Sequence, residues 1–234
     1  MISTDGKLYI KRVLADSNMA RSIAVGVGAR AEAVGDKYLH FEAARATINL
    51  VSFDYVNNKL IFKASIPQDF GGKIYEVGLW SSTANSAAGE FISRLLTAFD
   101  SNTEVWSIGT FQTTNARIGT DALRLAPSAS ATATSLLSDI FVDLSGNSGA
   151  DQFSIAYYNG NAFVANLRVR FKTDASNYYT ITVATPATGY QISTVNKSAA
   201  VVTGTPSWAN ITALEVEIVA TGGGAASVDF DGLR

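Results

Sequence analysis

The carboxy-terminal half of the chain alternates apolar and polar side chains over short segments, as strands with one buried face do. Leu167, Val169 and Phe171 alternate with Arg168 and Arg170. Gly, Asn, Ser and Asp interrupt such segments at intervals of roughly 8–12 residues, which is typical of a sandwich or barrel. The predicted strands cover residues 105–111, 121–126, 130–137, 139–144, 152–158, 162–171, 178–184, 189–196, 199–203, 212–220 and 227–233. Because one face of each strand is polar, we expect antiparallel pairing.

The amino-terminal half contains shorter segments of the same kind. The predicted strands there cover residues 7–13, 20–27, 48–56, 59–66 and 73–80. Asn57 and Asn58 tolerate positive φ, so they predict a hairpin turn. Residues 37–46 and 90–99 fit either a short helix or a strand, because their apolar positions suit both periods. The change in pattern predicts two domains, residues 1–97 and 102–234.

Composition narrows the range of functions. The 234 residues are 47% hydrophobic but only 16% charged, below the ~25% usual for soluble domains. The net charge is −2 and there is no basic tract, so we expect no nucleic-acid binding. The absence of cysteine excludes disulfides, thiolate nucleophiles and Cys-ligated zinc. We also expect no signal peptide, because the amino terminus has no continuous apolar region. We expect no membrane insertion, because no apolar run approaches ~18 residues.

Candidate catalytic groups are few. His40 is the only histidine and has no nucleophile motif beside it, so we expect a partly buried or interface residue. Asp229 and Asp231 share one face of a predicted strand, ~7 Å apart along it, and Glu215 and Glu217 do the same. That spacing is compatible with sugar hydrolysis. Because no aromatic sugar platform accompanies either pair, we expect both on a solvated strand face.

Tyrosines near turns rich in Asn and Gly are the candidate ligand contacts. They are Tyr157, Tyr158, Tyr178, Tyr179 and Tyr190. Such rings serve sugar binding, protein contact or simple packing, and the sequence leaves all three open. Adjacent strand residues point to opposite faces, so one tyrosine of each neighbouring pair must point inward.

Residues 23–81 hold a series of short motifs. A Gly-Val-Gly turn is followed by a Leu-x-x-Glu-x-x-Arg-x-x-Ile spacing, an Ile-Pro pair, a Gly-Gly pair and an Ile-x-Glu-x-Gly-Leu-Trp segment. The series resembles the amino-terminal domain of bacteriophage tail-collar fibre proteins, which fixes a fibre to the tail. The resemblance implies a scaffold motif of Glu42, Arg45, Gly71, Gly72, Glu76, Gly78 and Trp80. Glu42 and Arg45 suit either a surface ion pair, as on a helix, or a buried Arg held by two carboxylates.

The end of the chain carries a second resemblance. A Gly-x-Pro-x-Trp run at residues 204–208 leads into Ile-Thr-x-Leu, and Val-Asp-Phe-Asp-x-Leu closes the chain at residues 228–233. This resembles the last strands of jelly-roll domains of the carbohydrate-binding-module type, over about residues 105–234. The resemblance implies that Asp231 helps to hold a structural calcium ion, which needs several oxygen ligands. We expect no other cofactor.

Together the resemblances imply a mostly β protein, with a small β-rich attachment domain followed by an antiparallel jelly-roll β-sandwich. We expect a non-enzymatic phage virion protein, mounted on the tail or baseplate with the sandwich facing outward. A capsid decoration protein and a carbohydrate-binding receptor-recognition module are the alternatives. The expected partners are other phage structural proteins, a host surface glycan, and further copies in a homotrimer, because virion parts occupy symmetric platforms. The expected location is the virion, after synthesis in the host cytoplasm.

Overall fold

A computed structural model describes residues 22–28, 39–54, 56–57, 59–66, 73–80, 95–145 and 151–234. The chain divides into two compact units, Met1–Leu95 and Leu96–Arg234. The predicted strand at residues 7–13, Gly71 and Gly72 lie outside the described residues. In the described part of the chain, no helix is long and apolar enough to span a membrane.

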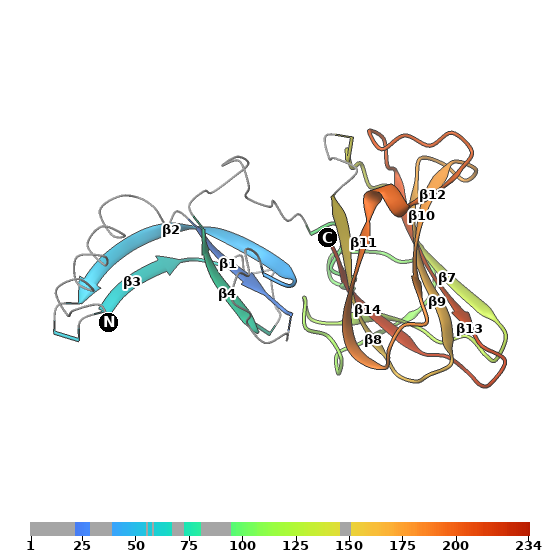
Figure 1. Ribbon diagram of the computed structural model, residues 1–234, viewed down its shortest axis with the longest axis horizontal. Helices are drawn as coiled ribbons and strands as arrows, with labels where there is room; N and C mark the ends of the chain where they lie inside the picture. Colours follow the sequence, from blue (N-terminus) through green and yellow to red (C-terminus); the bar gives the residue numbers. More distant parts are fainter. Residues whose placement is uncertain are drawn as a thin grey trace. The chain divides into compact units, whose positions relative to one another are not determined.

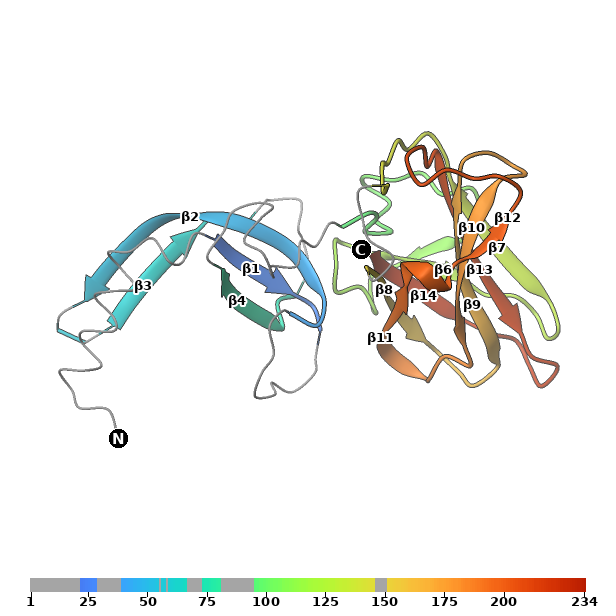
Figure 2. The same cartoon turned by 45° about the horizontal axis from the view of Figure 1, so that its top comes forward.

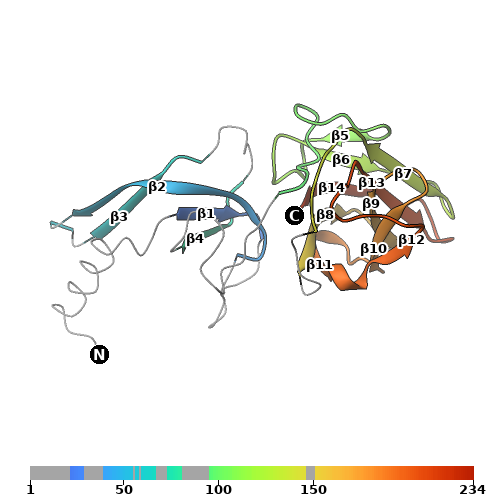
Figure 3. The ribbon, with the colours of Figure 1, turned by 90° about the horizontal axis from the view of Figure 1, so that it is seen from above.

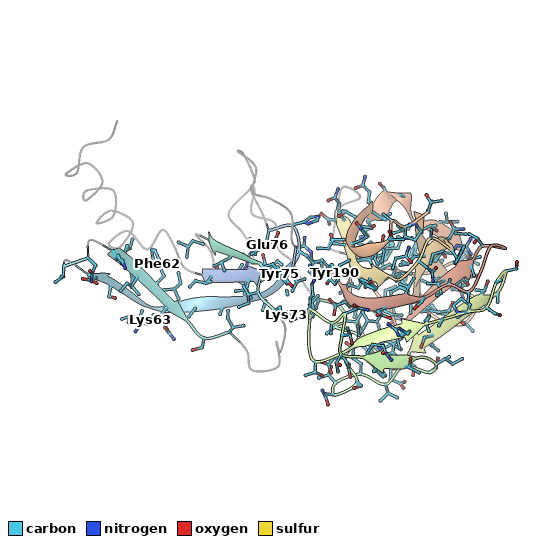
Figure 4. The ribbon with its side chains drawn as sticks, turned by 90° about the horizontal axis from the view of Figure 1, so that it is seen from below. Phe62, Lys63, Lys73, Tyr75, Glu76 and Tyr190 are labelled. Carbon is cyan, nitrogen blue, oxygen red and sulfur yellow. The ribbon has the colours of Figure 1, made fainter. Side chains whose placement is uncertain are left out.

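The first unit contains a curved sheet, shown in Figure 2. Its described strands are β1 (Ser22–Gly26), β2 (Glu42–Asp54), β3 (Lys59–Ala64) and β4 (Glu76–Trp80), in the order β3-β2-β1-β4. β2 and β3 form the predicted hairpin, and the Asp54 carboxylate accepts the N–H groups of Val56 and Asn57 in its turn. Phe62 and Lys63 alternate across β3 (Figure 4). Since β2 begins at Glu42, the helix alternative for residues 37–46 is wrong where the structure describes them.

The second unit is a β-sandwich whose two sheets face each other (Figures 1 and 3). Among its described residues, one sheet has the strand order β12-β10-β9-β13-β7 and the other β11-β8-β14-β6-β5. All of their pairings are antiparallel. The elements are β5 (Thr110–Gln112), β6 (Ala122–Leu125), β7 (Thr132–Leu137), β8 (Gln152–Asn159), β9 (Val164–Lys172), β10 (Tyr178–Ala184), β11 (Gly189–Asn196), the 3-10 helix η2 (Lys197–Ala199), β12 (Val201–Thr203), β13 (Ala213–Ala220) and β14 (Val228–Leu233). The predicted antiparallel jelly-roll sandwich is confirmed.

The core of the sandwich lies between the two sheets, where the alternation predicts it. Leu167, Val169 and Phe171 of β9 are fully buried and pack with Phe230 of β14. Trp208, from the predicted Gly-x-Pro-x-Trp run, stacks on the ring of Tyr179 with centroids 3.8 Å apart. Its partner rings Phe153 and Phe171 lie 5.7 and 5.4 Å away. The run therefore closes one end of the core with aromatic packing.

Three predicted segments differ most from the structure. Residues 139–144 form no strand, because Asp139 has φ +60 and only Val142 makes an isolated bridge, to Ile211. In residues 105–111 the strand starts at Thr110, after Gly109 with φ +126. Residues 95–99 are neither helix nor regular strand, because Phe99 has φ +54 and Thr97 makes a single bridge to Leu233. In each case a residue in the left-handed region or an isolated bridge interrupts the alternation.

Candidate functional site

The structure places the five candidate tyrosines in different environments. Tyr157 and Tyr179 point into the core. The alternation of side chains along a strand predicts this direction for one tyrosine of each neighbouring pair. Tyr157 is 1% exposed, and its hydroxyl lies 3.0 Å from the Ser193 hydroxyl. Tyr179 donates its hydroxyl hydrogen to the carbonyl oxygen of Pro206. These two tyrosines are packing residues, and no ligand could reach the ring of Tyr157.

Tyr158 and Tyr190 meet on the outer face of one sheet. Tyr190 on β11 (labelled in Figure 4) is the direct partner of Tyr158 on β8. The next residue in the same line is Asp229 on β14, followed by Arg124 on β6 and Thr110 on β5. We call this line of five residues the cross-strand row. With strands ~4.8 Å apart, the row spans ~19 Å across the sheet.

Asp229 and Arg124 form the charged centre of the cross-strand row. The Asp229 carboxylate is 1% exposed and accepts Arg124 Nε at 2.5 Å and Nη2 at 2.8 Å. The Asn115 side-chain amide also donates to it, at 2.5 Å. The hydrogen bond to Asp229 raises the pKa of Arg124 above its usual value. The Arg124 side chain remains 31% exposed, so it offers N–H groups to a ligand while it is held in one orientation.

Asp231 fixes a loop over one side of the same face. It lies at a β-bulge of β14 and is fully buried. Its carboxylate accepts the backbone N–H of Arg117 at 3.0 Å and of Ile118 at 3.2 Å, and it accepts the Tyr190 hydroxyl. Burial raises the pKa of Asp231 to about 6, against the lowering effect of these hydrogen bonds. The Arg117 guanidinium lies 3.6 Å from the centroid of the Tyr190 ring, in a cation–π contact.

This loop overturns the prediction that Asp229 and Asp231 lie on a solvated strand face. Residues 113–121 connect β5 to β6 and carry Asn115, Arg117 and Ile118 onto both carboxylates. The two side chains do share a face away from the core, as the alternation predicts. They are nevertheless buried, at 1% and 0% exposure, because the loop covers that face.

The surroundings of Asp231 do not fit a calcium ligand. A calcium ion is bound by oxygen atoms with free lone pairs. Two amide N–H groups and a phenol O–H instead point their hydrogens at the Asp231 carboxylate. Among the described residues, no three His, Cys, Asp or Glu side chains cluster closely enough to hold a metal ion. The contacts therefore give Asp231 the role of holding the loop.

The outer face of the opposite sheet carries the other carboxylate pair. Glu217 on β13 accepts Arg168 at 2.6 Å and Arg170 at 2.7 Å, both on β9. Glu215 accepts Arg170, and Lys172 at 2.9 Å. Burial raises the pKa of Glu215, but the hydrogen bonds from Lys172 and Arg170 outweigh it and lower that pKa. These carboxylates are thus occupied by cations and are poorly placed for proton transfer.

Tyr178 lies on this opposite face, away from the cross-strand row. Its direct partner on β9 is Lys172, and its partner on β12 is Thr203. The Arg170 guanidinium is 5.6 Å and the Lys172 ammonium 5.5 Å from its ring centroid. Tyr178 is therefore comparable with Tyr158 as an outward-facing strand tyrosine, but it lies on the opposite sheet and its ring is close to two cations.

In the first unit, two residues of the scaffold motif form an ion pair and a third, Glu76, hydrogen-bonds to backbone. A β-bulge at Ala43 puts Glu42 and Arg45 on the same face of β2, where they pair at 2.8 Å through two hydrogen bonds. Glu42 is 5% exposed, so this is a buried pair and not a helical surface pair. Glu76 does not share Arg45 in the described contacts, and instead accepts the backbone N–H groups of His40 and Phe41.

The other scaffold residues follow from the strand order. Gly78 pairs with Ala24 of β1, and Trp80 ends β4. Gly26, at the end of β1, has no room for a side chain. A Cβ there would lie 2.4 Å from the Phe41 carbonyl oxygen and 2.5 Å from Glu76 Oε2. The first glycine of the Gly-Val-Gly turn is therefore required by the close approach of the Phe41 backbone and of Glu76.

Sequence reasoning did not single out Asn115, Arg117 and Arg124. Arg124 alternates with Leu123 and Leu125 in a predicted strand, so its outward direction was available from the pattern. Its position opposite Asp229 depends on the register of β6 against β14. Asn115 and Arg117 lie in a loop, where no local pattern indicates which distant strand the loop contacts.

No protein-family model and no curated protein sequence matches the chain. Solved structures that match include a family 4 carbohydrate-binding module, at 15% identity and TM-score 0.33, over 55% of this chain and 92% of that one. A structure from the β-sandwich superfamily of carbohydrate-binding modules matches at 11% identity and TM-score 0.38, over 92% of this chain and 84% of that one.

Glycoside hydrolase structures also match. One is the glycoside hydrolase domain of Endo-D from Streptococcus pneumoniae R6, at 10% identity and TM-score 0.35, over 56% of this chain. The chain spans only 20% of that structure, and 22% and 23% of two others of this group. These structural likenesses all have identities of 15% or lower and TM-scores below 0.4.

Proposed function

We propose that the carboxy-terminal sandwich is a non-catalytic glycan-binding module and that its ligand lies along the cross-strand row. The observation that carries this proposal is the register that lines up Tyr190, Tyr158, Asp229 and Arg124 on one outer face. Glycan sites combine an aromatic ring with polar groups held in fixed directions. Tyr158 is half-buried and supplies the ring, and Arg124 supplies oriented N–H donors.

The charges in and beside the cross-strand row favour a neutral sugar as the ligand. Arg124 is neutralised by Asp229, and Arg117 lies beside Asp231 and Tyr190. A ligand with hydroxyl groups would meet donors and acceptors without a large net field. A strongly anionic glycan would gain little long-range attraction from a chain of net charge −2.

Binding without hydrolysis follows from the same contacts. A glycosidase needs one carboxyl that gives or takes a proton at the sugar and a second that acts opposite it. Asp229 is bound by Arg124 and Asn115, and Asp231 by Tyr190 and two backbone N–H groups. Buried carboxylates with these partners lack access to a glycosidic oxygen.

The test is a glycan array with the full chain, followed by titration of each hit. We expect binding of neutral oligosaccharides, and we expect Arg124→Met to bind them with strongly reduced affinity. Long incubation with any bound glycan should give no cleaved product. Binding of none of the glycans at millimolar concentration, or release of a cleaved product, would contradict it.

We infer from the resemblance of residues 23–81 that the first unit attaches the module to a phage particle. Its buried Glu42–Arg45 pair and braced glycine turn fit a scaffold. Attachment to the tail or baseplate remains the main prediction, with capsid decoration as the alternative. Labelling the chain in purified particles tests it: a location outside any particle would contradict it, and the copy number would separate tail from capsid.

A further inference from the structure

In the sheet of the first unit, the edge strand β4 carries exposed apolar side chains. β4 pairs with β1 on one side and, within the described residues, ends the sheet on the other (Figure 2). Val77 and Leu79 are 64% and 51% exposed and point to the same side of β4. Tyr75, labelled in Figure 4, continues this line at 47% exposure. An exposed apolar edge strand is a template for pairing with another strand.

The opposite edge of the same sheet is different. β3 carries exposed Lys59 and Lys63, and lysine on an edge strand discourages pairing with another chain. β4 has Glu76 as its charged residue, and that carboxylate is turned to the backbone N–H groups of His40 and Phe41. Exposed charge thus lies within β3, whereas on the β4 side the exposed Lys73 lies before the strand begins.

The sequence of β4 is compatible with itself in antiparallel register. With a two-fold axis at Val77, the two Val77 side chains meet, and Tyr75 of each copy faces Leu79 of the other. On the other side of the strand, Glu76 faces Gly78 of the second copy, so no like charges are opposed. The apolar line of one copy therefore meets the apolar line of the other along its whole length, as an isologous interface requires.

We propose that two copies of this chain associate through their β4 edges, which join the two sheets into one continuous antiparallel sheet. This is a dimer, in place of the trimer expected from virion symmetry, because the two-fold pairing uses β4 of both copies. The proposal is independent of glycan binding, which concerns the other unit.

The first test is the mass of the full chain in solution by light scattering over a dilution series. The expected result is the mass of two chains, shifting to one chain on dilution. Val77→Lys would oppose two lysines across the axis and raise the dissociation constant at least about tenfold. Val56→Lys is the matched control, because Val56 is an equally apolar residue, 93% exposed, in the β2–β3 turn. That variant should dimerise like the original chain.

A second variant covers the case in which Val77→Lys fails to fold. The chain has no cysteine, so Val77→Cys would carry its only thiol. Directly opposed residues of antiparallel strands have Cβ atoms ~4.5–5.5 Å apart, within reach of a disulfide after small adjustment. Mild oxidation should yield a covalent dimer for Val77→Cys and far less for Val56→Cys. A monomer at all concentrations, a trimer, or equal cross-linking of both variants would overturn the proposal.

Discussion

Arg124 on β6 and Asp229 on β14 face each other across two neighbouring strands and form a two-pronged ion pair, with Nε–Oδ1 at 2.5 Å and Nη2–Oδ2 at 2.8 Å. The carboxylate is buried and the guanidinium is partly exposed. The pair therefore serves the fold through Asp229 and presents the free side of Arg124 to the surface. It lies at the centre of the proposed ligand site.

Arg124→Met should destabilise the second unit by about 2 kcal/mol, because it removes the cation paired with a buried carboxylate and leaves that carboxylate the hydrogen bond of the neutral Asn115 amide. Arg168→Met is the matched control. Arg168 is similarly exposed, and its partner Glu217 keeps Arg170. Its cost should stay below about 1 kcal/mol. Urea unfolding measures both, and equal losses would contradict the special role of the Arg124–Asp229 pair.

Asp231 should make stability fall as the pH rises through about 6. Its folded pKa of about 6 exceeds the ordinary 3.8, so the folded state holds the proton more tightly than the unfolded chain. The stabilisation is complete below about pH 3.8 and is lost as pH rises through about 6, a change on the order of 3 kcal/mol.

The measurement compares the original chain with Asp231→Asn, which cannot titrate at this position. The difference in unfolding free energy between the two proteins should shift against the original chain between about pH 4 and about pH 7. A difference that stays constant with pH would show that Asp231 has no raised pKa.

Gly26→Ala should destabilise the first unit by about 2–3 kcal/mol, because the new methyl group overlaps a backbone carbonyl that cannot move aside easily. Hydrogen exchange of β1, β2 and β4 should accelerate. Gly160→Ala is the comparison, since its Cβ would meet Ser227 at an ordinary 3.5 Å. Unchanged exchange in Gly26→Ala would mean that the glycine turn is not packed as described.

Substitutions in the Tyr179–Trp208 stack should distinguish the stability that comes from ring packing from the stability that comes from the Tyr179 hydrogen bond. Trp208→Ala removes contacts with three rings and should cost about 3 kcal/mol. Tyr179→Phe keeps the stack and loses only the hydrogen bond to Pro206, so it should cost about 1 kcal/mol. Thermal unfolding tests both. A larger loss for Tyr179→Phe than for Trp208→Ala would reverse this assignment.

Strand positions in the sandwich follow largely from the sequence. Residues 178–184 and 189–196 were predicted with the bounds of β10 and β11, because alternation and turn residues agree there. Strict alternation in β9 also located the core face. The prediction of a strand at residues 139–144 is wrong because Asp139 adopts a left-handed φ, which apolar periodicity does not reveal.

The candidate site was only partly predictable. The sequence identifies the tyrosines and the carboxylates of β14 as residue types, and strand alternation predicts that one tyrosine of each neighbouring pair points inward without indicating which one. The cross-strand row depends on pairing registers between strands far apart in the chain. Burial of Asp229 and Asp231 depends on a loop more than a hundred positions earlier, which hydrogen-bonds to them at separations of 113 and 114 residues. Local patterns carry no information on such contacts.

The most direct test of the central claim is calorimetric titration of an array-selected oligosaccharide into the original chain, Tyr158→Ala and Tyr178→Ala. Tyr158 belongs to the cross-strand row and Tyr178 to the opposite face. Loss of the Tyr158 ring should weaken binding at least about tenfold, while Tyr178→Ala should bind like the original chain. Unchanged affinity in Tyr158→Ala with lost affinity in Tyr178→Ala would place the ligand on the other sheet and contradict the account.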